Sequence, residues 1–402
     1  MTWSVRSRWF FAVIMTAGMM FGTFGAPAMS VLAPFLVEEL GLTRTQLGTL
    51  FAISAALGAA FSPIAGRLID VVGGRRMLAA TCLLGGAATL GIAIAPGYGL
   101  LIAAACVSGL GWASGNPTTN KLIATHVPPG QRGLLIGLKA SGVQAGFFLG
   151  GALLPLGAIT LGWRPTLILT AAAASIWSLA TLLSLPRDHE SDESAGTRWR
   201  STGRIKGVGW LAAYSFLMGA GMTALTSYLP LYANEEMGLG PAHAGAVASA
   251  LGLTAVVSRI LWSRSGEGLS RLAPSLALIA ALSIAAVAAI WAAPLVGTWL
   301  LWAGAVAAGA SLTAWGGLTM LAVIGGTEAR HAGRASGMIQ LGFLSGLAWG
   351  PAAFGLLVDA TGSYSTGWLG VILLLAAGGL VTMTEGRAGP VRHDASPRQS
   401  SK

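Results

Sequence analysis

Charged side chains are scarce in this chain of 402 residues. Only 9% of the residues are Asp, Glu, Lys or Arg, whereas a soluble domain carries roughly 25%. With 54% hydrophobic residues and a mean hydropathy of +0.70, the chain cannot cover its surface with side chains that suit water. The composition therefore excludes a soluble protein and predicts an integral membrane protein held in a lipid bilayer.

Cysteine and the motifs of soluble enzymes are also scarce. The two cysteines, Cys82 and Cys106, fall inside apolar runs, which indicates small buried side chains and not a disulfide framework. The five histidines lack the spacing of metal ligands. No Walker loop occurs, which excludes ATP as the energy source. We expect no enzyme activity, no catalytic residue, no cofactor and no metal.

Twelve apolar runs are long enough to cross a bilayer, because a spanning helix needs roughly 20 residues. An all-α membrane fold follows, with a polar stretch at 186–207 predicted to be a cytoplasmic linker. This linker would join two six-helix bundles, 1–185 and 208–384, and a disordered cytoplasmic tail would occupy 385–402. The predicted spans are 9–36, 46–65, 77–95, 99–124, 134–160, 165–185, 208–234, 243–262, 273–293, 297–323, 336–358 and 367–384.

The basic residues predict the orientation, because Lys and Arg concentrate in short loops on the cytoplasmic side. With both termini inside, only Arg44 and Arg164 fall outside, and Lys121 and Lys139 are assigned to spans. The other Lys and Arg residues are assigned to cytoplasmic segments, and Arg259, near the inner end of the predicted span 243–262, is counted with the loop that follows this span. This bias accounts for the net charge of +10 without a nucleic-acid partner, and the predicted location is the bacterial cytoplasmic membrane.

A charged, glycine-rich hairpin between two spans occurs twice. The first copy covers 66–76, and a degenerate copy covers 263–271, where Arg264 and Glu267 correspond to Arg67 and Asp70. Two further pairs of segments repeat at nearly the same offset, namely 34–42 with 230–239 and 144–147 with 340–343. In a duplicated membrane bundle, the binding site is expected at the interface between the repeats.

The whole chain resembles the major facilitator superfamily. The loop signature of that family runs roughly Gly-x-Leu-small-Asp-basic-x-Gly-basic-basic. It is matched at Gly66, Leu68, Asp70, Gly73 and Arg75, and it is not matched at Ile69, Val71 and Gly74. The resemblance implies twelve helices in two pseudo-symmetric six-helix bundles, which transport a solute by alternating access.

The hairpin is the expected gate. The carboxylate of Asp70 can accept hydrogen bonds from free N–H groups at the start of a neighbouring helix, or pair with an arginine. The family resemblance implies that such contacts latch the two bundles together in the outward-facing state. The expected gating residues are Gly66, Arg67, Asp70, Gly73, Arg75 and Arg76, with Arg264 and Glu267 as a weaker counterpart. The alternative is that the arginines only anchor the loop on the cytoplasmic side.

No acidic residue falls deep within a predicted span, which argues against a buried carboxylate as proton carrier. Two cations do fall within spans, and ionisable residues inside a membrane are functional candidates. We expect Lys139, and with a weaker case Lys121, to attract an anion in the central cavity that spans 4 and 5 line by family resemblance. In the alternative, each lysine reaches the inner interface or pairs with an acid of a loop.

Neutral polar and aromatic residues complete the predicted substrate site. Gln144 and Gln340 hold equivalent places in the two halves, and an amide suits a small carboxylate or a polar neutral solute. Asn116 and Asn120 share one face of span 4. Tyr228 and Trp315 could form apolar walls with a polar tip. Ordinary packing between helices is the alternative for all of these side chains.

The sequence thus predicts a secondary transporter that moves a small solute, with a small organic anion preferred. Transport would occur by exchange with a counter-transported anion, or by symport in which the solute itself carries the proton. Residues 132–143 are similar to the corresponding span of bacterial permeases grouped with cyanate transporters. An exporter of drugs and other amphipathic compounds with the same fold is the first alternative, and a signalling or scaffolding membrane protein is the second.

Overall fold

The computed structural model describes residues 5–128, 132–185, 208–265, 272–316, 318–319 and 329–385, and the regular structure in these ranges is helical. Nine helices belong to the first half of the chain: α1 Val5–Gly22, α2 Gly25–Val31, α3 Ala33–Leu40, α4 Arg44–Val72, α5 Gly74–Ala93, α6 Tyr98–His126, α7 Arg132–Ala140, α8 Gly142–Leu161 and α9 Trp163–Ser184. The second half holds α10 Val208–Glu235, α11 Pro241–Ser265, α12 Leu272–Val296, α13 Thr298–Ser311, α15 Ala329–Thr361 and α16 Tyr364–Glu385.

Ten of the described helices are long and apolar enough to cross a membrane. The bent pair Trp9–Gly22 and Gly25–Val31, with 57° between its parts, makes an eleventh span. The remaining predicted span, 297–323, begins with α13, and residues 320–323 lie outside the described part of the chain. The predicted all-α membrane fold is confirmed, and the predicted spans agree with the helices to within a few residues at most ends.

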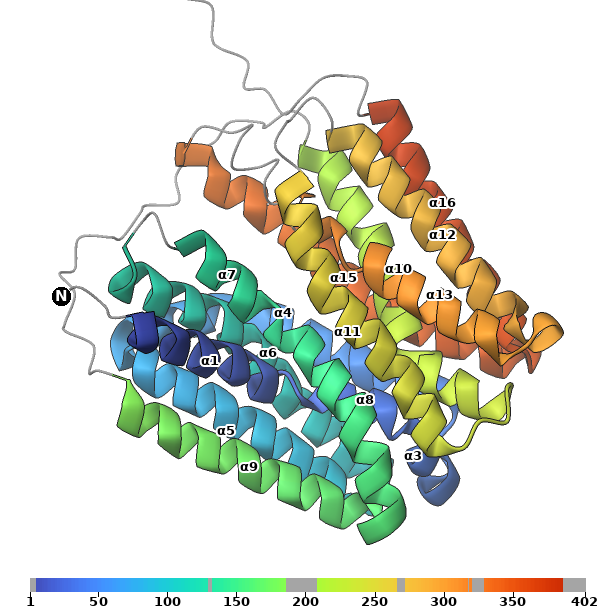
Figure 1. The fold of residues 1–402 in the computed structure, drawn as a ribbon, viewed down its shortest axis with the longest axis horizontal. Helices are drawn as coiled ribbons and strands as arrows, with labels where there is room; N and C mark the ends of the chain where they lie inside the picture. Colours follow the sequence, from blue (N-terminus) through green and yellow to red (C-terminus); the bar gives the residue numbers. More distant parts are fainter. Residues whose placement is uncertain are drawn as a thin grey trace, which may run out of the picture.

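The two halves of the chain lie on opposite sides of the molecule (Figure 1). Helices α1 to α9, coloured blue to green, gather on one side, and α10 to α16 gather on the other. The halves meet along two helix pairs, α4 with α15 and α8 with α11, and α10 adds contacts with α2 and α3. The predicted linker 186–207 and residues 386–402 of the predicted tail lie outside the described residues.

The backbone repeats between the halves. Gly41 ends α3 with φ 61°, and Gly238 has φ 63° in the turn after α10. Residues with side chains rarely adopt this left-handed conformation, so glycine is favoured at both turns. The turn between α4 and α5 likewise has Gly73 at φ 87°. We call the end of the bundle that carries the turn between α4 and α5 the hairpin end. The opposite end, which carries Gly41 and the start of α4, is the Arg44 end.

Glycine lets the two halves approach each other closely. A Cβ atom added to Gly151 of α8 would lie 2.5 Å from the carbonyl oxygen of Gly245 in α11. A Cβ atom added to Gly48 of α4 would lie 2.2 Å from the carbonyl oxygen of Pro351 in α15. In a membrane, where lipid tails are as apolar as the side chains, close packing of this kind drives the association of helices.

Candidate functional site

Lys139 is buried against α6 within the first half. It lies at the end of α7, where the fifth predicted span breaks at Ser141, and its side chain is only 3% exposed. Its Nζ donates to Asn116 Oδ1 at 2.9 Å and to Thr119 Oγ1 at 3.1 Å, both on α6. These acceptors are neutral, so they satisfy the hydrogen bonds of the ammonium group without balancing its charge. The structure thus brings together two of the predicted substrate-binding residues, Lys139 and Asn116.

Asn116 belongs to a stripe on α6 that faces the second half. Four residues earlier, Trp112 packs against Phe343 of α15 with 6.3 Å between the ring centroids. Residues four apart in a helix share a face, so Asn116 and Asn120 follow Trp112 along this stripe. Both asparagines are exposed, although they lie within a membrane-spanning helix. The face of α6 directed at the second half is therefore closed at Trp112 and open below it towards the hairpin end.

Trp315 and Gln340 are both close to Phe343, the first by packing against its ring and the second by its place in α15. Trp315 is buried against Phe343 at 5.4 Å and against Tyr214 at 6.0 Å between ring centroids. Its indole Nε1 is buried and finds no hydrogen-bond partner in the part of the chain that the structure describes. Gln340 is exposed and comes three residues before Phe343 in α15. An aromatic chain therefore runs from the second half to Trp112, with an unsatisfied donor at Trp315.

Arg259 is the residue of this region that the sequence reasoning missed. It lies within α11, six residues before the end of the helix, and not in a loop. Its Nη1 donates to the carbonyl oxygen of Ala140 at 3.3 Å, across the interface between the halves. With the Gln144 amide oriented so that its oxygen faces the guanidinium, that oxygen accepts from Arg259 Nη2 at 3.2 Å, and the amide nitrogen donates to the Ala140 carbonyl at 3.0 Å.

A sequence signal for Arg259 does exist. Gly245, Gly252 and Arg259 are spaced seven residues apart, which keeps them on one face of a helix. A Cβ atom added to Gly252 would lie 2.6 Å from the backbone nitrogen of Phe148 in α8. Because the two glycines let α11 pack on α8, an arginine at the next position of the same stripe must also face α8.

Lys121 lies at the hairpin end. Its Nζ donates to Asp70 Oδ1 at 2.8 Å and to the carbonyl oxygen of Ile69 at 3.2 Å. Both partners belong to α4, so the ion pair stays within the first half of the chain. The structure therefore places Lys121 with the hairpin and not with Lys139, as in the alternative in which it pairs with an acid of a loop.

The remaining predicted gating residues lie in the last turns of α4 and at the start of α5. Arg75 donates to the carbonyl oxygen of Leu185 at 3.3 Å, and Arg67 and Arg76 are exposed. Gly66 lies in open space, and Gly73 provides the positive φ of the turn. The predicted counterpart lies beyond what the structure describes, since the side chain of Arg264 and the whole of Glu267 fall outside the described residues.

The two halves are joined at the Arg44 end by a polar cluster that we call the Arg44 closure: Arg44, Tyr228, Glu235, Asp359 and Tyr364. Asp359, near the end of α15, accepts hydrogen bonds from the backbone N–H groups of Arg44 and Thr45 at 3.2 and 2.7 Å. These N–H groups start α4 and have no partner within their own helix. A carboxylate of the second half therefore caps a helix of the first half.

Side chains reinforce the Arg44 closure. Arg44 Nη2 pairs with Glu235 Oε2 at 2.8 Å, and the Tyr364 hydroxyl donates to the same oxygen at 2.6 Å. The hydroxyl of Tyr228 donates to the carbonyl oxygens of Arg44 and Pro351. The structure thus places Tyr228, a predicted substrate-binding residue, in the Arg44 closure and not beside Lys139.

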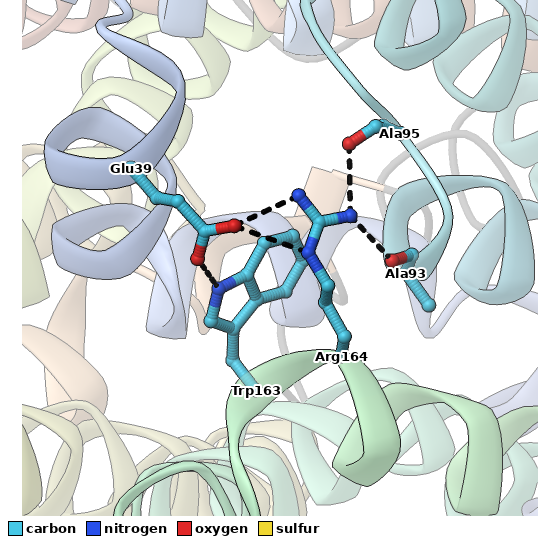
Figure 2. A network of polar contacts seen from close by, with 5 residues as sticks. All are labelled: Glu39, Ala93, Ala95, Trp163 and Arg164. Carbon is cyan, nitrogen blue, oxygen red and sulfur yellow. Dashed lines mark hydrogen bonds and ion pairs between the residues drawn. The ribbon is translucent and has the colours of Figure 1, made fainter.

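A second polar network at this end lies within the first half (Figure 2). Glu39 of α3 accepts hydrogen bonds from the Trp163 indole and from Arg164 Nε and Nη2 at 3.1 and 2.9 Å. Arg164 also donates to the carbonyl oxygens of Ala93 and Ala95, each at 3.0 Å. The hydrogen bonds from Trp163 and Arg164 hold the pKa of Glu39 below its ordinary value. The network ties the ends of α3, α5 and α9 together.

Glu39 is expected to make thermal stability depend on pH. Because the pKa of Glu39 is lower in the folded protein, its contribution to stability is present above the unfolded pKa of about 4.5 and is lost as pH falls through the folded pKa. The melting temperature of Glu39→Gln should therefore lie below that of the wild type at pH 7. The difference between the two melting temperatures should become smaller as the pH is lowered. The matched control Glu38→Gln, at the exposed neighbouring position, should leave the melting curve unchanged at both pH values. A gap that stays constant from pH 7 to pH 3 would contradict this role.

The fold and the site define a class: a helical membrane protein whose two halves close on each other at one end while polar residues remain accessible between them towards the other. The family model for the Major Facilitator Superfamily matches residues 9–326, and the chain belongs to this superfamily. The predicted family and the transporter class are confirmed.

Several transporters are similar to this chain in sequence. A probable sulfoacetate transporter of Cupriavidus necator is 28% identical over 91% of this chain and 93% of its own length. A hexuronate transporter of Bacillus subtilis is 27% identical over 38% of this chain and 36% of its own length. A 4-hydroxybenzoate transporter of Acinetobacter baylyi is 26% identical over 46% of this chain and 40% of its own length.

A solved structure confirms the fold. A bacterial homologue of the human lysosomal transporter Spinster, in an inward-facing and occupied conformation, superposes with a TM-score of 0.76. It is 16% identical, and the match covers 98% of this chain and 100% of that chain. This likeness extends to the arrangement of the helices across both halves.

Proposed function

We propose that this transporter moves a small organic anion, with a carboxylate or sulfonate group, across the bacterial cytoplasmic membrane. The observation that carries the proposal is the pair of cations on either side of the Ala140 peptide, Lys139 from the first half and Arg259 from the second. Within the described part of the chain, neither cation forms an ion pair. A positive charge inside a membrane protein is costly unless it is paired, so an anionic solute supplies what the site lacks.

The similar transporters support the same chemistry. Sulfoacetate, hexuronates and 4-hydroxybenzoate, which appear in the names of the relatives, are all organic acids. One similar protein favours the rival function: a multidrug resistance protein of Proteus mirabilis is 28% identical over 66% of this chain. Drug export therefore remains the second candidate function, and the two candidates differ in the charge of the solute.

Alternating access accounts for the two ends of the molecule. The Arg44 closure joins the halves at one end, whereas Asp70 at the hairpin end forms its ion pair within its own half. With the hairpin and both termini on the cytoplasmic side, this arrangement corresponds to an inward-facing transporter. The described acids lie at the ends of helices, so the driving force would come from a proton carried by the solute or from a counter-transported anion.

A thermal-shift screen of the detergent-purified protein tests the proposal. A ligand that binds only the folded state stabilises it by about 2.7 kcal/mol at a concentration of 100 Kd. We expect sulfoacetate, galacturonate or 4-hydroxybenzoate to raise the melting temperature, and galactose, the neutral match of galacturonate, to leave it unchanged. Stabilisation by tetraphenylphosphonium, with no response to the three anions, would favour drug export and contradict the proposal.

A further inference from the structure

We propose that Arg259 is the ligand by which the second half of the transporter binds the acidic group of the solute. The Gln144 amide oxygen and the Ala140 carbonyl oxygen accept from the guanidinium at the positions that the oxygens of a carboxylate or sulfonate take during transport. This inference rests on the proposed transport of organic anions, and it deepens that proposal by naming the residue of the second half that recognises the anion.

The packing of α11 on α8 determines the position of Arg259. It ends a stripe of close contacts between α11 and α8, in which Ser249 Oγ donates to the carbonyl oxygen of Phe148 at 2.6 Å. Gly245 and Gly252 bring the two backbones together on the same stripe. The direction of the guanidinium is thus fixed by helix packing, and it points at the first half of the protein.

The acceptors of the Arg259 guanidinium are neutral oxygens. A guanidinium carries five N–H donors in a planar fork that matches the two oxygens of a carboxylate. Here it meets one carbonyl oxygen at 3.3 Å and one amide oxygen at 3.2 Å. Its Nε is buried and has no hydrogen-bond partner among the described residues. Arg259 thus makes two long hydrogen bonds to neutral oxygens and has one unsatisfied donor. An oxyanion would bind this guanidinium more strongly than the two neutral oxygens do.

A second cation belongs to the same turn of α7. Lys139 immediately precedes Ala140, whose carbonyl accepts from Arg259, so each half of the protein contributes one positive residue to this turn. Charge-assisted hydrogen bonds are roughly twice as strong as neutral ones. An oxyanion that displaces the Gln144 oxygen and the Ala140 carbonyl would therefore replace weak contacts between the halves with a stronger one that includes the solute.

The test measures binding of sulfoacetate and galacturonate to the full-length protein in detergent by isothermal titration calorimetry. Arg259→Gln should weaken the affinity for both anions by at least about 30-fold, the loss typical when one partner of a buried charge pair is removed. Arg259→Lys keeps the charge but lacks the planar fork, so its affinity should fall between those of the wild type and Arg259→Gln. The matched control Ser249→Ala, which loses a contact between the same two helices without a change in charge, should bind as the wild type does.

The outcomes separate this inference from the proposed function. If Arg259→Gln binds both anions as tightly as the wild type while Lys139→Gln does not, anion transport stands and the role of Arg259 is overturned. If the wild-type protein binds neither anion, both proposals fail. If Arg259→Gln does not yield folded protein, the affinity of Arg259→Lys for the two anions is the test. An affinity equal to that of the wild type would show that the planar guanidinium does not bind the solute.

Discussion

Replacing Lys139 with Gln should abolish uptake of an anionic solute into proteoliposomes. The substitution removes the charge of a residue that is 3% exposed and leaves a neutral hydrogen-bonding group in its place. Loss of one partner of a buried charge pair costs about 2–5 kcal/mol. Because each 1.4 kcal/mol is a factor of ten, uptake of sulfoacetate at limiting concentration should fall about 30-fold or more.

The matched control for Lys139→Gln is Arg132→Gln, which removes one positive charge from the start of the same helix, α7. Arg132 donates to the carbonyl oxygens of Ala124 and Val127 at the end of α6, away from the candidate site. Uptake by this control should stay within about twofold of the wild type, in the range of ordinary surface substitutions. If both variants lose uptake equally, or if Lys139→Gln keeps it, Lys139 does not bind the solute.

The second large effect is expected from Gly48→Val in α4. A side chain at this position would meet the carbonyl oxygen of Pro351 at 2.2 Å and the hydroxyl of Tyr228 at 2.6 Å, so the halves could not close at the Arg44 end. Overpacking costs about 1–3 kcal/mol, and more where backbone stands in the way. Uptake should fall at least about tenfold, because alternating access needs each end to close in turn.

The closed state itself can be followed by labelling. Ser30 is fully buried, and its hydroxyl donates to the carbonyl oxygen of Thr226 in the other half at 2.5 Å. With Cys82 and Cys106 replaced, Ser30→Cys should react slowly with a membrane-impermeant maleimide in the wild-type background and faster with Gly48→Val. Gly99→Val is the control, because a Cβ atom there meets nothing within 4 Å. Equal labelling rates in the two variants would refute the steric block.

Much of the architecture could be predicted from the sequence, for physical reasons that particular residues make clear. Apolar runs set the spans because water cannot satisfy backbone groups inside a bilayer. Gly73 of the hairpin was identified by the loop signature of the family, and the structure shows why glycine suits this turn, where φ is 87°. Lys139 and Asn116 were each predicted as substrate-binding residues from the types of their side chains, but the hydrogen bond between them was not predicted.

The contacts between the halves could not be predicted in the same way. The hydrogen bond from Arg44 N–H to Asp359 joins residues 315 positions apart, and no local pattern reveals such a partner. Arg259 was assigned to a loop because the distribution of Lys and Arg indicates the side of the membrane and not the depth of a side chain. The depth of Arg259 became clear only from the packing of α11 on α8.

The pair α4 and α15 carries the same chemical group at both ends. The two helices run in opposite directions, since the start of α4 meets the end of α15, and each has an aspartate two residues before its last residue, Asp70 and Asp359. Asp359 accepts hydrogen bonds from the start of α4, and we propose that Asp70 makes the corresponding contact with the start of α15 when the hairpin end closes. A substitution that weakens either contact by about 1.4 kcal/mol should then shift the ratio of the two states about tenfold, in opposite directions for the two aspartates.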